Sequence, residues 1–380
     1  MVRKLLFLGI LGAVSANVLA QKARLNLMNE GDHLSFEVSY NKKVVIPSSP
    51  LGLNVDNRIL GKGVSVTPVM SQSGNGIKTY EVKHTDGSLL YVDVRESDDG
   101  VAFRYRLPAD GPKCIYGEQT TFTFPDNTKV WYASSPFQYG WIQAYQDRNI
   151  STVDNELLAP PATFQLPDGC YAAITEANLF NFHGAVLFGE KGNKVRFGYV
   201  ENKGHLETGS ITGIPDARYY HEVVRNVPWI VYPTAGAKEI KTPWRILMLA
   251  DDLNGLVNNK IIASVSDQPD KNLFPDGAKT SWIKPGRSVF TWLVEGPDRL
   301  SVANHKKYVD GAAELGLQSV VVDDGWELWP STEPEGKAKS KWEYMSDLVN
   351  YAKAKGVDIW VWRPSSPRTG LSLIHISEPT

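Results

Sequence analysis

The stretch "VVVDDGW", Val320–Trp326, decides the fold of the C-terminal part of the chain. Three β-branched residues in succession are typical of a strand buried on both faces, as strands in parallel sheets usually are. The apolar run ends at two carboxylates, a glycine and a tryptophan. Because ligands of parallel α/β folds bind at the carboxyl ends of the strands, the stretch predicts a site at the end of a buried strand.

The same order of elements recurs on both sides of this stretch. Strands and helices alternate in the order strand 288–296, helix 301–316, strand 317–322, helix 346–356 and strand 357–362. Ser301 is a suitable N-cap, and Gly316 and Gly356 are suitable stops. The alternation predicts a parallel sheet covered by helices on both faces. We expect the fold to be the first part of a (β/α)8 TIM barrel, at residues 280–363.

The N-terminal part follows a different pattern, with many short strands and almost no helical periodicity. Leu34–Tyr40, "LSFEVSY", alternates apolar and polar residues, and residues 79–107 hold three strand-like runs separated by Asp-Gly turns. Further runs rich in β-branched and aromatic residues lie at 129–134, 170–177, 184–190, 194–201, 227–233 and 243–250. We therefore expect a large β-sandwich over residues 21–265, followed by a linker at 266–279 that is rich in Pro, Asp and Lys.

The two ends of the chain carry segments of their own. Residues 1–20 are typical of a secretory signal, with Arg3 and Lys4 before an apolar run too short to span a bilayer. This predicts a periplasmic or secreted protein without a membrane span. Residues 364–380 have no strand or helix pattern and resemble the translated read-through of a sequencing adapter, so we expect them to be foreign to the protein.

The composition limits the classes of partner that we expect for the protein. The net charge of -2 gives no electrostatic reason to expect nucleic acid or an anionic membrane as a partner. The 2 cysteines, Cys114 and Cys170, could pair in an oxidising compartment, and the sequence leaves this open. Oligomeric state has no signature in the sequence.

Several common chemistries have no motif in this chain. The 7 histidines form neither His-x-His nor His-Glu-x-x-His, and no Gly-x-Ser-x-Gly elbow or phosphate-binding glycine loop occurs. What remains is an acid pair beside aromatic residues, and glycoside cleavage requires paired carboxylates. Asp323 is the better site candidate, since Asp324 precedes Gly325 and is more typical of a turn. Trp326, Trp360 and Trp362 either line a sugar subsite or fill the core.

Four stretches in order along the chain resemble glycoside hydrolase family 97. They are Ala172–Leu179 "AAITEANL", Ser281–Trp292 "SWIKPGRSVFTW", Val320–Trp326, and Ala352–Trp362 "AKAKGVDIWVW". The resemblance implies an exported, exo-acting α-glycoside hydrolase, either an α-glucosidase or an α-galactosidase, which acts on an oligosaccharide or another α-glycoside. It implies substrate-binding roles for Trp292, Asp323, Trp326, Trp360 and Trp362.

The resemblance also implies calcium as a cofactor, with Glu176 as a ligand. From the residues alone, Glu176 is either a surface acid at a strand end or, with Asn178, a source of hard oxygen ligands. The family's catalytic carboxylates lie on later barrel strands than the three found here. We therefore expect this chain to contain no catalytic residue and to be inactive as given. Glucoside or galactoside specificity, and a retaining or inverting mechanism, stay open.

Two alternatives come from other classes. A non-enzymatic carbohydrate-binding sandwich would present a row of exposed aromatic residues, for which the candidates are Trp131, Tyr132, Tyr139, Trp141 and Tyr145. The other alternative is an unrelated α/β-barrel enzyme with a β-rich N-terminal extension.

Overall fold

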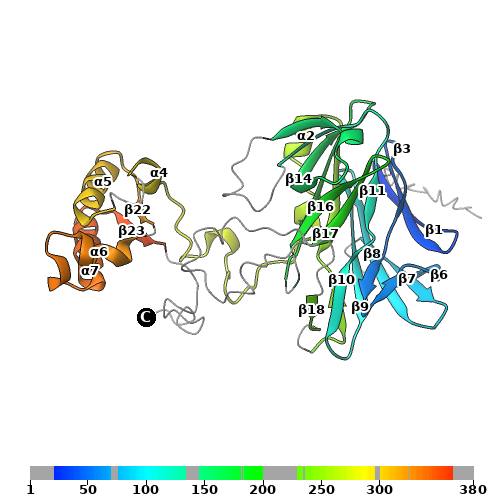
Figure 1. The fold of residues 1–380 in the computed structure, drawn as a ribbon, viewed down its shortest axis with the longest axis horizontal. Helices are drawn as coiled ribbons and strands as arrows, with labels where there is room; N and C mark the ends of the chain where they lie inside the picture. Colours follow the sequence, from blue (N-terminus) through cyan, green and yellow to red (C-terminus); the bar gives the residue numbers. More distant parts are fainter. Residues whose placement is uncertain are drawn as a thin grey trace, which may run out of the picture. The chain divides into compact units, whose positions relative to one another are not determined.

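The computed structural model describes residues 21–69, 76–133, 145–180, 182, 184–199, 229–233, 236–295, 300–323 and 325–362. Asp324 and the segments 1–20 and 364–380 lie outside this range. The chain divides into two compact units, Met1–Asp267 and Gln268–Thr380. The first is built from antiparallel strands and the second from parallel strands and helices (Figure 1). No helix in the described ranges is long and apolar enough to cross a membrane.

The N-terminal unit is a large antiparallel β-structure. Its strands are β1 Ala23–Glu30, β2 His33–Tyr40, β3 Lys43–Pro50, β4 Leu53–Val55, β5 Arg58–Leu60, β6 Val64–Val69, β7 Ile77–His84, β8 Leu89–Ser97, β9 Gly100–Pro108, β10 Lys113–Glu118, β11 Thr121–Thr123, β12 Lys129–Ala133, β13 Gln146–Asn149, β14 Leu157–Gln165, β15 Tyr171–Ala177, β16 Ala185–Glu190, β17 Lys194–Tyr199, β18 Trp229–Val231, β19 Glu239–Lys241 and β20 Trp244–Ala250. Short helices are η2 Ile150–Thr152, α2 Leu253–Val257 and α3 Ile261–Val265.

These strands form three sheets. Strands β1-β2-β3 form one sheet, β18-β10-β4-β5 a second, and the third follows the path β11-β17-β16-β14-β15-β20-β9-β8-β7-β6, with β12, β13 and β19 paired alongside. Alternate residues of β2 point into the core, where Phe36 lies 5.4 Å from Phe103 of β9 and 5.3 Å from Phe122 of β11 between ring centroids. The sheets thus bury their apolar faces against one another, as a β-sandwich does.

The predicted strand runs in this unit are confirmed where the structure describes them, but several strands were missed. β3 and β14 are examples, because each contains two prolines, which lower the strand signal. In β14 the prolines Pro160 and Pro161 lie between two different pairings. Leu157 and Leu158 pair with β16, whereas residues 162–165 pair with β15. Cys114 and Cys170 are both free thiols, so the structure contains no disulfide between them.

The C-terminal unit contains a three-stranded parallel sheet in the order β21-β22-β23. The strands are β21 Ser288–Phe290, β22 Ser319–Val322 and β23 Asp358–Val361. Helix α5, Val302–Glu314, connects β21 to β22, and helix α7, Lys341–Lys353, connects β22 to β23. The shorter elements are η3 Gly277–Lys279, α4 Trp292–Glu295, η5 Trp326–Leu328, α6 Trp329–Thr332 and η6 Gly336–Ala338.

The helix boundaries follow from capping residues. Ser301 caps α5 by accepting a hydrogen bond from the Asn304 backbone N–H at 3.1 Å, and Gly316 takes the left-handed conformation (φ +64°) that ends this helix. The prediction for α7 began too late, at residue 346. The helix starts after Ser340, which forms a reciprocal capping box with Glu343.

The strand predicted over 288–296 is wrong beyond Phe290. Thr291 turns the chain into α4, and its carbonyl oxygen accepts hydrogen bonds from the backbone N–H groups of Val294 and Glu295 at 3.1 and 3.0 Å. The β-branched and aromatic residues of this segment favour a strand, but the local hydrogen bonds of a helical turn prevail over that preference.

The predicted coverage of the parallel sheet on both faces is also wrong for the described residues. Val320 and Val322 are fully buried against α5 and α7, which pack against each other and so lie on the same face. On the other face Val321 is half-buried and Trp360 is 62% exposed. Strands in sequential order with helices on one face are the arrangement that a (β/α)8 barrel repeats, but three strands do not close a barrel.

Candidate functional site

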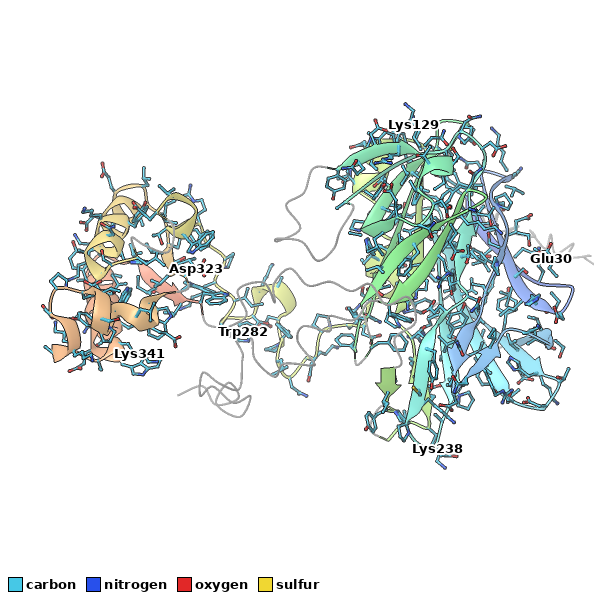
Figure 2. The ribbon with its side chains drawn as sticks, in the orientation of Figure 1. Glu30, Lys129, Lys238, Trp282, Asp323 and Lys341 are labelled. Carbon is cyan, nitrogen blue, oxygen red and sulfur yellow. The ribbon has the colours of Figure 1, made fainter. Side chains whose placement is uncertain are left out.

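The carboxyl ends of the three parallel strands bring together residues that are distant in sequence. We call Thr291, Asp323 and Trp362, which directly follow β21, β22 and β23, the carboxyl edge. The Trp362 backbone N–H donates to the Val322 carbonyl at 2.8 Å, so Trp362 and Asp323 lie at neighbouring strand ends. Figure 2 shows Asp323 at the end of its strand.

Asp323 and Trp362 continue the face of the sheet that carries no helix. Side chains two positions apart point to the same face of a strand, so Asp323 follows Val321, and Trp362 follows Trp360. Trp360 and Trp362 are both exposed, and Asp323 is half-buried. A carboxylate next to two accessible indole rings can accept hydrogen bonds from hydroxyl groups and offer flat apolar surface to a sugar ring.

Trp326 fills the core, which is one of the two roles left open for it and differs from the substrate-binding role that the resemblance implies. Its ring is 1% exposed and packs edge-on against Trp329 and Trp342, with centroid distances of 6.2 and 5.2 Å. Gly325 (φ +102°) makes the sharp turn that directs the ring into the core. The Trp326 indole N–H donates to the Trp362 carbonyl at 3.1 Å. Trp326 therefore supports the edge and does not line it.

Trp292 and His305 both lie near the end of β21, but the first begins α4 and the second is buried. Trp292 begins α4 and is half-buried, so it does not belong to a strand. His305, which the sequence analysis did not select, is buried under Thr291, with 3.4 Å between its Nε2 and the Thr291 Oγ1. Its Nδ1 lies 2.8 Å from the Ser301 carbonyl oxygen. Burial lowers the pKa of His305, although its hydrogen bond to Ser301 opposes this, so the ring fixes α5 to the end of β21 in its neutral form.

Glu176 lies in a buried ionic cluster of the N-terminal unit. Arg245 of β20 is its direct partner in the sheet, and the Arg245 Nη1 donates to the Glu176 Oε2 at 2.6 Å. The same guanidinium donates to Glu118 through Nε at 3.0 Å, and its Nη2 donates to the Tyr199 hydroxyl at 2.8 Å. The side chains of Arg245 and Glu118 are 0% exposed, whereas Glu176 is 14% exposed.

The cluster has one cation for two carboxylates. Burial opposes the charge of Arg245, but the attraction of Glu118, Tyr199 and Glu176 outweighs it and raises the pKa of Arg245 well above its ordinary value. Burial, reinforced by Glu118, likewise raises the pKa of Tyr199 well above its usual range, so its hydroxyl stays protonated. Among the described residues of the cluster, Glu176 alone reaches solvent, because the Arg245 and Glu118 side chains are fully buried. Arg245 lies inside the otherwise apolar run "WRILMLA", and a charged residue in such a run is a sequence feature that indicates a buried ionic cluster.

The residues around Glu176 fit a calcium ion incompletely. Calcium takes about six to eight oxygen ligands. One Glu176 oxygen already accepts from Arg245, and the other accepts from the Ala185 backbone N–H at 3.0 Å. The Asn178 side-chain oxygen accepts from the Asp267 N–H at 3.1 Å and is turned away from this role. No group of three or more His, Cys, Asp or Glu in the described part of the chain could hold a metal. We therefore assign no chemical step to a metal.

Two other surfaces bear on the choice of site. A pocket of about 640 Å³ in the C-terminal unit is lined by Ser288, Ser319 and Asp358, the first residues of the three strands, and also by Val321 and Trp360. It therefore extends from the end opposite to the carboxyl edge along the sheet face of Val321 as far as Trp360, and neither Asp323 nor Trp362 lines it. Of the proposed aromatic row of the sandwich, Tyr132 is fully buried and does not belong to an exposed face, whereas Trp131 is half-buried and Tyr145 is 63% exposed. Tyr139 and Trp141 lie outside the described residues.

Comparison with curated proteins identifies two bacterial relatives. The chain is 30% identical over 367 residues to the "Probable retaining alpha-galactosidase" of Streptomyces bingchenggensis, covering 90% of this chain and 51% of that protein. It is 23% identical to the "Retaining alpha-galactosidase" of Bacteroides thetaiotaomicron, covering 87% of this chain and 53% of that protein. The chain thus spans about half the length of the curated relatives it matches.

Solved structures share the fold. A beta-arabinopyranosidase superposes with a TM-score of 0.67 at 21% identity, covering 91% of this chain and 54% of that one. A glycoside hydrolase family 97 enzyme from Pseudoalteromonas sp. strain K8, in complex with acarbose, gives a TM-score of 0.66 at 20% identity, covering 89% of this chain and 52% of that one.

The family comparison covers most of the chain in two parts. Residues 281–374 match the family described as "Glycoside hydrolase 97". This range extends beyond residue 363, and the foreign origin of residues 364–380 stays a prediction. Residues 20–268 match "Glycosyl-hydrolase 97 N-terminal". The chain therefore belongs to glycoside hydrolase family 97.

Proposed function

We propose that this chain is part of an exo-acting α-glycoside hydrolase, an α-galactosidase or α-glucosidase, and that its C-terminal unit is the first part of a (β/α)8 barrel. The names of the two curated relatives support an α-glycosidase. The observation that carries the proposal is the parallel sheet in sequential strand order, with the acid Asp323 and the exposed indole of Trp362 at its carboxyl edge and the exposed indole of Trp360 on the same face.

In this proposal the carboxyl edge contacts the sugar. Asp323 accepts hydrogen bonds from sugar hydroxyls, and Trp360 and Trp362 offer their rings to the C–H face of the sugar. Trp326 acts as a positioning residue, because its indole N–H holds the backbone of Trp362. Trp292 contributes from the start of α4, where it is half-buried.

Hydrolysis itself takes two carboxyl groups, separated by about 5–10 Å. One protonates the glycosidic oxygen, and the other attacks the anomeric carbon or activates a water molecule. From the family resemblance we expect both groups on barrel strands that follow the three found here. We therefore propose that the chain as given binds sugar but does not cleave it, so p-nitrophenyl α-galactoside and α-glucoside should be hydrolysed only at the background rate.

Calcium is a separate part of the proposal. Glu176 would be one ligand of an ion whose other ligands come from outside the described residues, and Arg245 would then have to share Glu176 with the ion. Isothermal titration with calcium, comparing the parent chain with Glu176→Gln, tests this independently of activity. Calcium binding of equal affinity in the two proteins would remove Glu176 from the site.

Export follows from the pattern of residues 1–20. The mature protein would begin near Gln21 and act on glycans in the periplasm or outside the cell. Mass spectrometry of the protein recovered from the extracytoplasmic fraction gives the first residue directly. A protein that keeps Met1 and stays in the cytoplasm would contradict export.

The sugar site is tested by tryptophan fluorescence during titration of the chain with methyl α-galactoside and methyl α-glucoside. We expect a saturable change that Asp323→Ala weakens at least tenfold and Trp362→Ala removes. Trp282→Ala is the matched control, because Trp282 is exposed in the same unit and lines a pocket to which neither Asp323 nor Trp362 contributes. A fluorescence change that survives in both edge variants would contradict the proposed site.

A further inference from the structure

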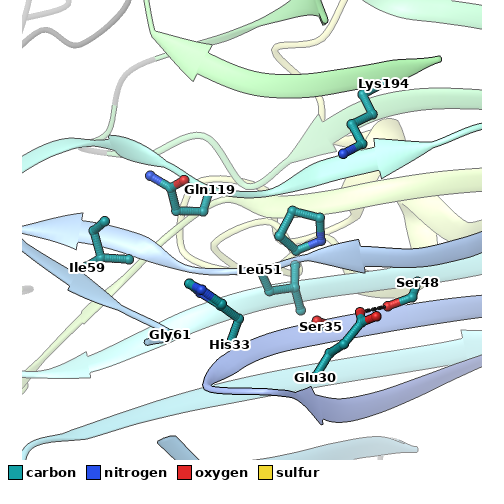
Figure 3. Close-up of a pocket in the computed structure, with 10 residues that line it drawn as sticks. Glu30, His33, Ser35, Ser48, Leu51, Ile59, Gly61, Gln119 and Lys194 are labelled. Carbon is teal, nitrogen blue, oxygen red and sulfur yellow. Dashed lines mark hydrogen bonds between the residues drawn. The ribbon is translucent and has the colours of Figure 1, made fainter. Parts of the chain in front are cut away.

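A second pocket, in the N-terminal unit, has no part in the function proposed above. It has a volume of about 520 Å³ and receives side chains from well-separated segments of the sandwich (Figure 3). Pockets that bind small molecules typically measure about 300–1,000 Å³. The pocket is therefore large enough for a sugar unit.

Strand register builds one wall of this pocket. Glu30 and His33 are direct partners at the end of the β1-β2 hairpin, and Ser35 of β2 is opposite Pro50 of β3. Cross-strand partners and residues two positions apart lie on the same face of a sheet. Glu30, His33 and Ser35 therefore share one face with Pro50 and, two residues earlier, Ser48. The intervening residues of β2 point into the core.

The opposite side of the pocket comes from other strands. Gln119 follows β10, and Lys194 begins β17, so neither is a neighbour of the first wall in sequence. Between the two sides, the backbone at Gly61 approaches the Leu51 carbonyl so closely that a Cβ there would lie 2.7 Å from this oxygen. The site is thus formed by paired backbone that leaves little room to rearrange.

The polar groups that face the pocket have unused hydrogen-bonding capacity. Within the described residues, neither the Lys194 ammonium nor the Gln119 amide has a hydrogen-bond or ionic partner. The Glu30 carboxylate accepts from the Ser48 hydroxyl and retains its second oxygen (Figure 3). Donors and acceptors therefore line the same space, above the apolar side chains of Leu51 and Pro50.

This combination indicates the class of ligand. Glu30 and Lys194 bring one charge of each sign to the pocket, so a net anion or a net cation meets one attractive and one repulsive group, whereas a hydroxyl group can donate a hydrogen bond to Glu30 and accept one from Lys194. Leu51 and Pro50 can contact C–H groups. We propose that this pocket binds a neutral sugar unit and gives the sandwich a second glycan site. Among the described residues, no Phe, Tyr or Trp ring lines the pocket, so we expect binding in the millimolar range.

The proposal is tested by saturation-transfer NMR on the full chain carrying Asp323→Ala and Trp362→Ala, which removes the carboxyl edge from the measurement. The probes are methyl α-galactoside and methyl α-glucoside, with glucose 1-phosphate and glucosamine as charged counterparts. Lys194→Met together with Gln119→Leu removes the polar groups of one wall at similar side-chain volume. Lys129→Met is the matched control, since it removes the same charge at an exposed strand start outside the pocket.

We expect saturable binding of the neutral sugars, weakened at least tenfold by the pocket substitutions and unchanged by Lys129→Met. Thermal melting shows whether the substituted chains are folded, and the single variant Gln119→Leu replaces the pair if they are not. Absence of neutral-sugar binding, equal binding by the pocket variant, or tighter binding of a charged probe would overturn the proposal. No tryptophan of the described residues lines the pocket. A negative result for this pocket would therefore leave the fluorescence result at the carboxyl edge unchanged, and a negative result at the carboxyl edge would leave the result for this pocket unchanged.

Discussion

Replacement of Arg245 by methionine is expected to destabilise the N-terminal unit strongly. The substitution keeps an unbranched aliphatic stem but removes the guanidinium group, so Glu118, which is 0% exposed, loses its counter-charge. It also removes the hydrogen bonds from the guanidinium to Glu176 and the Tyr199 hydroxyl. A buried ion pair adds little net stability while intact, but the loss of one partner leaves an uncompensated charge in the core.

The expected magnitude follows from this geometry. Removal of one partner of a buried pair costs about 3–5 kcal/mol, and whole domains are stable by only about 5–15 kcal/mol. With a urea dependence of about 3 kcal/mol per molar for a unit of this size, the unfolding midpoint should fall by about 1–2 M. Urea unfolding followed by far-ultraviolet circular dichroism measures this change, because the signal of the N-terminal unit is dominated by its strands.

Arg58→Met is the control, since Arg58 pairs with Asp86 at the surface and should shift the midpoint little. A urea midpoint of Arg245→Met within 0.3 M of the parent would refute the reasoning. By the same urea dependence, this difference corresponds to a loss of only about 1 kcal/mol in the free energy of unfolding.

Three further predictions concern the C-terminal unit and use tryptophan fluorescence during urea unfolding. Burial lowers the pKa of His305 below its unfolded value of 6.5. The free energy of unfolding of this unit should therefore be highest above pH 6.5 and decrease as the pH falls below it, and His305→Gln should reduce this decrease. Gly325→Ala should cost about 1–2 kcal/mol, because a φ of +102° is unfavourable for alanine. Ser340→Ala should cost about 1 kcal/mol through loss of the capping box, and equal stability of Ser340→Ala and the parent would contradict the assigned start of α7.

Short-range signals predicted much of this fold. The β-branched run of β22 and the cap and stop of α5 are local, so the sequence was sufficient to predict them. Strand β14 was missed because Pro160 and Pro161 argue against a strand, and only the pairing with two different neighbours explains how they are accommodated. The lack of helices on one face of the parallel sheet could not be predicted either, because burial on that face depends on the packing of distant segments.

The sites show the same division between local and long-range information. The position of Asp323 at a strand end was predicted, but the burial of Trp326 depends on Gly325 and on packing against Trp342. Glu176 was selected from a motif, whereas its partner Arg245 comes from a strand much later in the chain. The pocket at Glu30 and Lys194 joins segments that have no shared sequence pattern, so only the assembled sheets bring them together.

The sugar site at the carboxyl edge can be tested residue by residue with ¹⁹F NMR of the chain labelled with 5-fluorotryptophan. Signals are assigned by single Trp→Phe substitutions and followed during titration with methyl α-galactoside and methyl α-glucoside. A saturable shift of the Trp362 and Trp360 signals, with the buried Trp244 of the sandwich unaffected, is the predicted result. Edge signals that stay fixed at saturating sugar, or that move no more than Trp244, would contradict a sugar site at the ends of the three parallel strands.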